Sequence, residues 1–134
     1  MFTATKFSSV EDKEKFAKQF KKFVQSDFDY SKFPKWFYNR LSMCYGMIAH
    51  YDQNGFYHTF FTTTQGKVRF LDDVMQYPCY GAPDYTFSDV EKYLQQWIKE
   101  QGLLEVYRQR FYDERNKQER MEYERLKAKF EPNL

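Results

Sequence analysis

The chain has 134 residues, of which 42% are hydrophobic and 30% charged, with a formal net charge of +2. This balance excludes a disordered chain, and the length is sufficient for one domain with a core of its own. The small net charge gives no support to duplex DNA binding, and no run of roughly 20 apolar residues could span a membrane.

A first helix is expected to start at Ser8 or Ser9. Ser8 and Glu11 have the spacing of a capping box, and apolar residues then recur at a helical period: Phe16, Phe20, Phe23 and Val24. The intervening lysines fall mostly on other faces. The sequence therefore predicts an amphipathic helix that ends before the turn at residues 27–31.

A second helix is expected after this turn, because Pro34 suits the first turn of a helix. Its apolar positions follow the spacing i, i+4, i+7 and i+11: Phe37, Leu41, Cys44 and Ile48. Gly46 weakens the last part of this helix. A strand over residues 47–52 is therefore the alternative for that segment.

Residues 56–71 are expected to form an antiparallel β-hairpin. Gln65-Gly66 would turn a strand over 56–63 into a second strand over 67–71, and rings would occupy both faces of the first strand. Asn54-Gly55 precedes it, and both of these residues tolerate positive φ. The pair would add residues 47–52 to the sheet if that segment is a strand.

Two more helices are expected in the last third of the chain. One begins near Ser88, with Glu91 as its capping-box partner, and ends at Gly102. The other covers residues 103–130, which contain no Pro or Gly. Its apolar positions form two separate stripes divided by the polar stretch 113–120: Leu104, Tyr107 and Phe111, then Tyr123, Leu126 and Phe130.

The predicted fold class is α+β, with about four helices on a small antiparallel β-sheet and a long charged C-terminal helix. Residues 1–112 would form the compact α+β domain, and residues 113–134 a charged helical extension of it. The expected core consists of Phe16, Phe20, Phe37, Leu41, Ile48, Phe60, Phe70, Leu94, Trp97 and Ile98.

Candidate catalytic and metal-binding residues are few. His50, Asp52 and His58 lie within nine residues, but two ligands do not close a metal site, and no third His or pair of Cys has a matching spacing. Cys79 lies in a loop without a nucleophile signature around it. Asp72-Asp73 fit the start of a short helical turn better than an acid–base pair. We therefore expect a non-enzymatic protein with no metal and no cofactor.

Aromatic residues dominate the composition, with fifteen Phe, twelve Tyr and two Trp. So many tyrosines leave part of the ring surface near water, where aromatic side chains are typical of protein interfaces. Tyr and Arg are common in binding hot spots, and they gather on the C-terminal helix. These residues are the predicted protein-binding site: Tyr107, Arg108, Arg110, Tyr112 and Tyr123.

A basic first segment supports an alternative, which is binding of single-stranded nucleic acid. Residues 1–50 carry nine Lys or Arg and five Asp or Glu, a net of +4, whereas residues 51–100 have a net of −3 and residues 101–134 of +1. Cations interleaved with rings can follow phosphates and stack on bases. The candidate contacts are Lys18, Lys21, Lys22, Lys35, Trp36 and Arg40.

The two cysteines, Cys44 and Cys79, form no disulfide framework, and the start MFTATKFSS has no apolar run typical of a signal peptide. We therefore expect a cytoplasmic protein. In composition and style, the chain resembles the small accessory proteins of phages and plasmids. That resemblance implies binding and inhibition of a host protein by occlusion, with defence proteins among the targets, and the C-terminal helix could also pair two copies of the chain.

Overall fold

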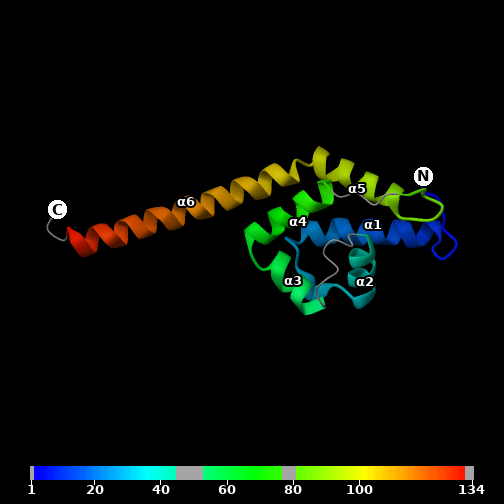
Figure 1. Cartoon of the computed structure of the whole chain (residues 1–134), viewed down its shortest axis with the longest axis horizontal. Helices are drawn as coiled ribbons and strands as arrows, with labels where there is room; N and C mark the ends of the chain where they lie inside the picture. The colour runs from blue at the N-terminus through cyan, green and yellow to red at the C-terminus, as the bar shows by residue number, and fades with distance from the viewer. Residues whose placement is uncertain (1, 45–52, 77–80, 132–134) are drawn as a thin grey trace.

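The computed structural model describes residues 2–44, 53–76 and 81–131, and these residues form helices and loops without any strand (Figure 1). In chain order the elements are α1 (Val10–Gln25), the short 3-10 helix η1 (Tyr30–Lys32), α2 (Lys35–Cys44), α3 (Gln53–Phe61), α4 (Thr64–Gln76), α5 (Ser88–Glu100) and α6 (Leu103–Phe130).

The predicted α+β fold is therefore wrong, because the two segments expected to pair as a hairpin are the helices α3 and α4. The rings of α3 decide its conformation. Phe56, Tyr57, Phe60 and Phe61 are all buried, and their spacing of one, four and five residues places them on one side of a helix. Asn54-Gly55 lies in the first turn of α3 instead of forming a hairpin turn. Residues 47–52 lie outside the described residues.

Thr63 explains why the chain turns from α3 into α4 without a strand. Its hydroxyl accepts a hydrogen bond from the Gly66 N–H at 3.0 Å, and its carbonyl accepts one from the Lys67 N–H at 3.1 Å. This is the arrangement of an N-cap residue. Gly66 lies so close to α3 that a Cβ atom there would be 2.7 Å from the carbonyl oxygens of Thr59 and Phe60.

Replacement of Gly66 by Ala should lower the free energy of unfolding by about 1–3 kcal/mol, because the new methyl group meets backbone atoms that cannot turn away. Urea denaturation followed by circular dichroism measures this change. The matched control is Gly102→Ala, since a Cβ there has only the Glu105 side chain within reach, although its φ of +60° brings a backbone cost. An unchanged midpoint for Gly66→Ala would contradict the close approach of α3 and α4.

The ends of α1 and α5 differ in detail from expectation. The N-cap of α1 is Ser9, whose capping box uses Asp12 and not the predicted Ser8 and Glu11. In α5, Ser88 is the first helical residue, and Phe87 precedes it without a side-chain cap. Gly102 follows the C-cap of α5 with φ +60°, which confirms its predicted place at that helix end.

The core lies where α1 is covered by α5 on one side and by α2 and α3 on the other (Figure 1). Phe23 is at its centre, with ring centroids 4.8 Å from Phe61, 5.2 Å from Phe28 and 5.4 Å from Phe37. Of the ten expected core residues, Trp97 is only half-buried and Ile48 is not described, while the other eight are buried.

The long helix α6 was predicted correctly, and only its first part packs on the body. It contacts α4 and α5, then continues away from the other helices to the C-terminal end (Figure 1). Among the described residues, no helix has both the length and the apolar character needed to cross a membrane.

Candidate protein-binding surface

Asp27 anchors α6 to the end of α1. It has φ +59°, and its carboxylate accepts hydrogen bonds from the Tyr107 hydroxyl and from Arg110 Nη1, each at 2.7 Å. Lys67 of α4 lies 3.3 Å from the same carboxylate. The Tyr107 ring is 4% exposed and packs on Phe28. Tyr107 and Arg110, both predicted to contact a partner, therefore hold the molecule together.

The anchor is sensitive to acid. Burial raises the pKa of Asp27, but the hydrogen bonds from Tyr107, Arg110 and Lys67 outweigh it, so the pKa is lowered overall. Burial and then the bond to Asp27 raise the pKa of the Tyr107 hydroxyl, which keeps it a proton donor. Because the folded-state pKa of Asp27 lies below its unfolded value, its stabilisation is complete above the unfolded pKa and is lost as the pH falls through the folded pKa.

Asp27→Asn should therefore cost roughly 1 kcal/mol of stability near neutral pH and almost nothing at acid pH, since half of this side chain is exposed to screening solvent. Asn suits the positive φ, so the backbone is retained. The difference in unfolding free energy across an acid pH series checks this. The exposed Asp84→Asn is the control, and a cost independent of pH would contradict the anchor.

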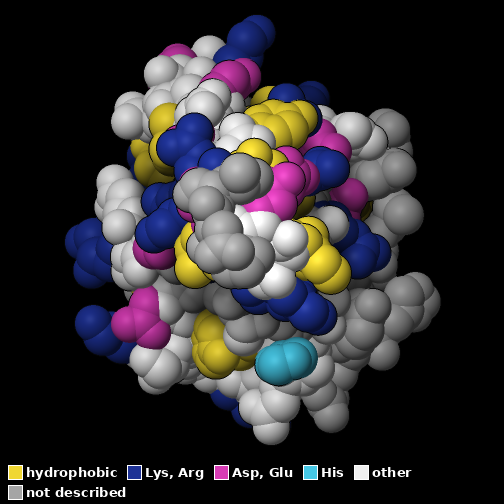
Figure 2. Space-filling view, turned by 90° about the vertical axis from the view of Figure 1, so that its left-hand side faces the viewer, with side chains coloured by type: hydrophobic (Ala, Val, Ile, Leu, Met, Phe, Trp, Pro, Cys, Tyr) yellow, Lys and Arg dark blue, Asp and Glu magenta, His cyan; other side chains and the backbone are white. Residues whose placement is uncertain are grey.

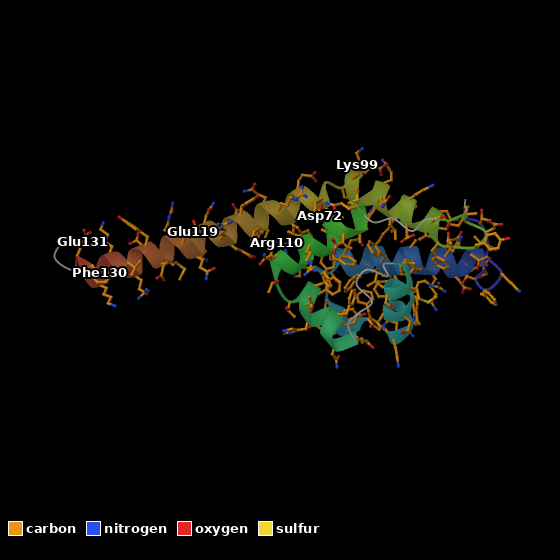
Figure 3. All side chains as sticks on the ribbon, in the orientation of Figure 1. Asp72, Lys99, Arg110, Glu119, Phe130 and Glu131 are labelled. Carbon is orange, nitrogen blue, oxygen red and sulfur yellow. The ribbon has the colours of Figure 1, made fainter. Side chains whose placement is uncertain are left out.

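Two further contacts hold α6 on α4. Arg108, also predicted as a partner contact, forms an ion pair with Asp72 at 3.3 Å. Near the end of the packed part, the Thr64 hydroxyl donates to Glu114 Oε1 at 2.9 Å. Figure 3 shows Asp72 and Arg110 where α6 passes along α4, whereas Glu119 and Phe130 lie on the part that leaves the body.

Residues 112–130 of α6, here called the α6 projection, are all exposed, and near its start Glu114 still contacts Thr64 of α4. At 1.5 Å per residue they extend for about 28 Å. Tyr112 and Tyr123 are 53% and 61% exposed, and Phe130 is 70% exposed. Seen from the C-terminal side, the molecule shows apolar side chains interspersed with many basic and acidic ones (Figure 2). Of the five predicted contacts, Tyr112 and Tyr123 remain available to a partner.

The exposed rings of the projection share one face. With about 100° per residue, Tyr112, Tyr123, Leu126 and Phe130 fall within about 60° of one another. This face, called the aromatic stripe below, is rotated by roughly 100° from Leu104 and Tyr107, which pack on the core. Leu126 and Phe130 belong to the second predicted stripe but not to the predicted binding site, although their spacing alone places them on this face.

Four of the six candidate nucleic-acid contacts line two separate surface clefts, and the other two, Lys22 and Lys35, line neither of them. Lys18 and Lys21 line a cleft of about 250 Å³ beside Tyr93. Lys21 Nζ donates a hydrogen bond to the Tyr93 hydroxyl and lies over the Tyr93 and Trp97 rings. Lys22 and Lys35 are exposed. The structure thus does not bring these cations to one surface.

Trp36 and Arg40 line a second cleft of about 360 Å³, together with Lys15 and exposed Phe7. The Arg40 guanidinium lies 4.1 Å from the centre of the Phe87 ring, and Lys15 Nζ lies 4.5 Å from that of Trp36. Such cation–π pairs contribute about 0.5–1 kcal/mol each at exposed sites. Each cation near this cleft thus has a ring partner within the protein.

The other candidate residues do not form a reactive site in the part of the chain described. His58 is exposed on α3, while His50, Asp52 and Cys79 lie outside the described residues. Asp72 and Asp73 lie in the second half of α4, not at the start of a helical turn, and burial raises the pKa of Asp73. Across residues 2–44, 53–76 and 81–131, no cluster of three potential metal ligands occurs.

The α6 projection is therefore the surface on which the predicted contacts and the exposed rings coincide. Comparison of the chain with protein-family models, with curated proteins and with solved structures finds no match.

Proposed function

We propose that this protein is a non-enzymatic interaction module that binds a partner protein through the α6 projection. The partner we propose is a host protein, with defence proteins as the leading class. Binding of the module would inhibit this partner by covering its active or ligand-binding surface. The composition shared with phage and plasmid accessory proteins supports this class of partner. The proposed compartment is the cytoplasm.

One observation carries the proposal, which is the aromatic stripe on a helix segment that leaves the body. The stripe consists of Tyr112, Tyr123, Leu126 and Phe130, and each of these side chains is at least 38% exposed. A solitary polar helix gains little from its own i, i+4 ion pairs, of which Arg115–Glu119 at 3.2 Å is one. Rings on such a helix gain much more when a partner buries them.

Affinity capture from host extract tests the proposal. The double variant Tyr123→Ala/Phe130→Ala should weaken partner capture by at least about tenfold, because a hot-spot ring contributes about 2 kcal/mol or more. Its thermal midpoint should stay unchanged, since neither side chain touches the core. Met121→Ala is the matched control, because Met121 is 63% exposed on the opposite side of the same helix.

Nuclease treatment separates this proposal from its alternative. Capture of a partner that persists after nuclease treatment, and that is lost with the Tyr123→Ala/Phe130→Ala variant, supports the protein-binding function. Recovery that collapses with nuclease and is insensitive to this variant contradicts it. The candidate contacts of the Lys-rich first segment, among them Lys18, Lys22 and Arg40, would then be the first residues to replace in a test of single-stranded nucleic-acid binding.

A further inference from the structure

The stripe of the α6 projection has the spacing of a coiled-coil seam. Steps of four, three, four, three and four residues connect Tyr112, Asn116, Glu119, Tyr123, Leu126 and Phe130. In heptad terms, Asn116, Tyr123 and Phe130 occupy a positions, and the other three occupy d positions. Together they span about 80° of the helix surface. A helix lying on a globular core has an apolar face of about 100° or more, whereas a narrow seam suits one facing helix.

Charges beside the seam oppose pairing of two copies in parallel. The e and g positions flank the core of a coiled coil and determine which helices pair. Parallel pairing would place Glu119 against its own copy within the seam. It would also place Arg115 against the second copy's Arg120. Only Glu122 and Lys127 would meet an opposite charge.

Antiparallel pairing of two copies is no better. Aligning Tyr112 with the second copy's Phe130 places Arg120 against Arg120 and Glu122 against Glu122, and Arg115 against Lys129. Asp113 and Lys127 would then form the only attractive pair. Like charges at these positions act against self-association.

The cations beside the seam indicate the charge of the helix that fits. Within the described residues, Arg115 is paired with Glu119 at 3.2 Å, and Glu122 is paired with Arg125 at 2.5 Å. No described carboxylate forms an ion pair with Arg120, Lys127 or Lys129. Lys129 lies over the Phe130 ring, with Nζ 5.2 Å from its centre. The end of the seam is therefore basic on both sides.

We propose that the α6 projection binds an amphipathic helix of a different protein, with apolar residues in its seam and acidic residues beside it. This inference rests on the proposed function and specifies the chemistry of its partner. The C-terminal helix is accordingly expected to pair with a different protein and not with a second copy of this chain. Arg120, Lys127 and Lys129 select the partner, while Tyr123, Leu126 and Phe130 supply the buried contact.

The test uses the full chain and two synthetic helical peptides, each about three heptads long. Both have Leu at the a and d positions, with Lys at the core position that meets Glu119. One has Glu at every e and g position, and the other has Lys there. Fluorescence anisotropy should show at least about tenfold tighter binding of the Glu peptide, and this preference should weaken with salt.

A charge-reversed chain provides the decisive comparison. Arg120→Glu/Lys127→Glu/Lys129→Glu should reverse the preference, so that the Lys peptide binds more tightly. Circular dichroism must show that this variant keeps the helix content of the parent. Tyr123→Ala/Phe130→Ala should lose both peptides, and Met121→Ala should lose neither. Equal binding of the two peptides, or an unchanged preference after reversal, would overturn the inference.

Analytical ultracentrifugation completes the test. The chain should sediment as a monomer at every concentration, and a dimer lost in Tyr123→Ala/Phe130→Ala would identify a second copy as the occupant and overturn the inference. If neither peptide binds, the inference fails. The proposed function would in that case still be supported if a host protein is captured after nuclease treatment and its capture depends on the aromatic stripe.

Discussion

Replacement of Asp89 by Ala is expected to lower the free energy of unfolding by about 3–5 kcal/mol, because it leaves a fully buried ammonium group without its counter-ion. Lys13 has a side-chain exposure of 0%, and its Nζ lies 2.8 Å from Asp89 Oδ1. The same Nζ donates to the Pro83 carbonyl oxygen at 2.7 Å. Asp89 Oδ2 also accepts from the Thr3 N–H at 2.9 Å. The Asp89 carboxylate thus links α5 to α1 and to the N-terminal segment, while Lys13 also bonds the segment before α5.

The matched variant is Lys13→Met, which removes the ammonium group but fills the same space. It should cost less than Asp89→Ala, because the Asp89 carboxylate that remains is 17% exposed and keeps backbone N–H donors. In the double variant, Lys13→Met should recover part of the loss caused by Asp89→Ala. Chemical denaturation of the four proteins measures this cycle. Equal costs for the two single variants would contradict a buried, charge-dependent clamp.

Phe23→Ala is expected to destabilise the protein by about 3–5 kcal/mol, the usual cost of removing a buried ring. Phe23 is 0% exposed, and its ring contacts include those with Phe61 at 4.8 Å and Phe33 at 5.1 Å. From α1, its ring contacts Phe33, which caps η1, Phe37 of α2 and Tyr57 of α3. A cavity here removes the ring contacts of α1 with each of these three residues at once.

Two controls separate the cavity from a general effect of losing a ring. Phe23→Leu retains much of the volume and should cost less than Phe23→Ala. Phe7→Ala removes an 88% exposed ring and should leave the urea midpoint nearly unchanged. If Phe23→Ala and Phe7→Ala shift the midpoint equally, the central position of Phe23 in the core is wrong.

Local signals were sufficient for the helices that carry a clear period and clear ends. The first and last helices were predicted close to their observed bounds, because polar residues interrupt their apolar positions at a helical spacing. Gly102 supported the boundary between α5 and α6 through its freedom to adopt positive φ. The second stripe of α6 was also visible in the spacing of Tyr123, Leu126 and Phe130.

The segment 53–76 could not be assigned from local pattern. Its rings are so dense that both a two-residue and a helical period fit Phe56 to Phe61. Asn54-Gly55 and Gln65-Gly66 then favoured turns. In the folded chain, burial of one face of α3 against Phe23 and Phe28 selects the helix. The cap at Thr63 and the close approach at Gly66 are visible only when the two helices lie together.

Composition and periodicity predicted the aromatic core and the long charged C-terminal helix, but the small β-sheet that they also predicted is absent from the described residues. Only the tertiary structure decided which tyrosines of that helix are free. Tyr107 and Tyr123 look alike in sequence, yet α4 and Asp27 cover the first, while the second lies beyond the body. The reason is that periodicity shows which side chains share a face, whereas their burial depends on how far the neighbouring helices extend.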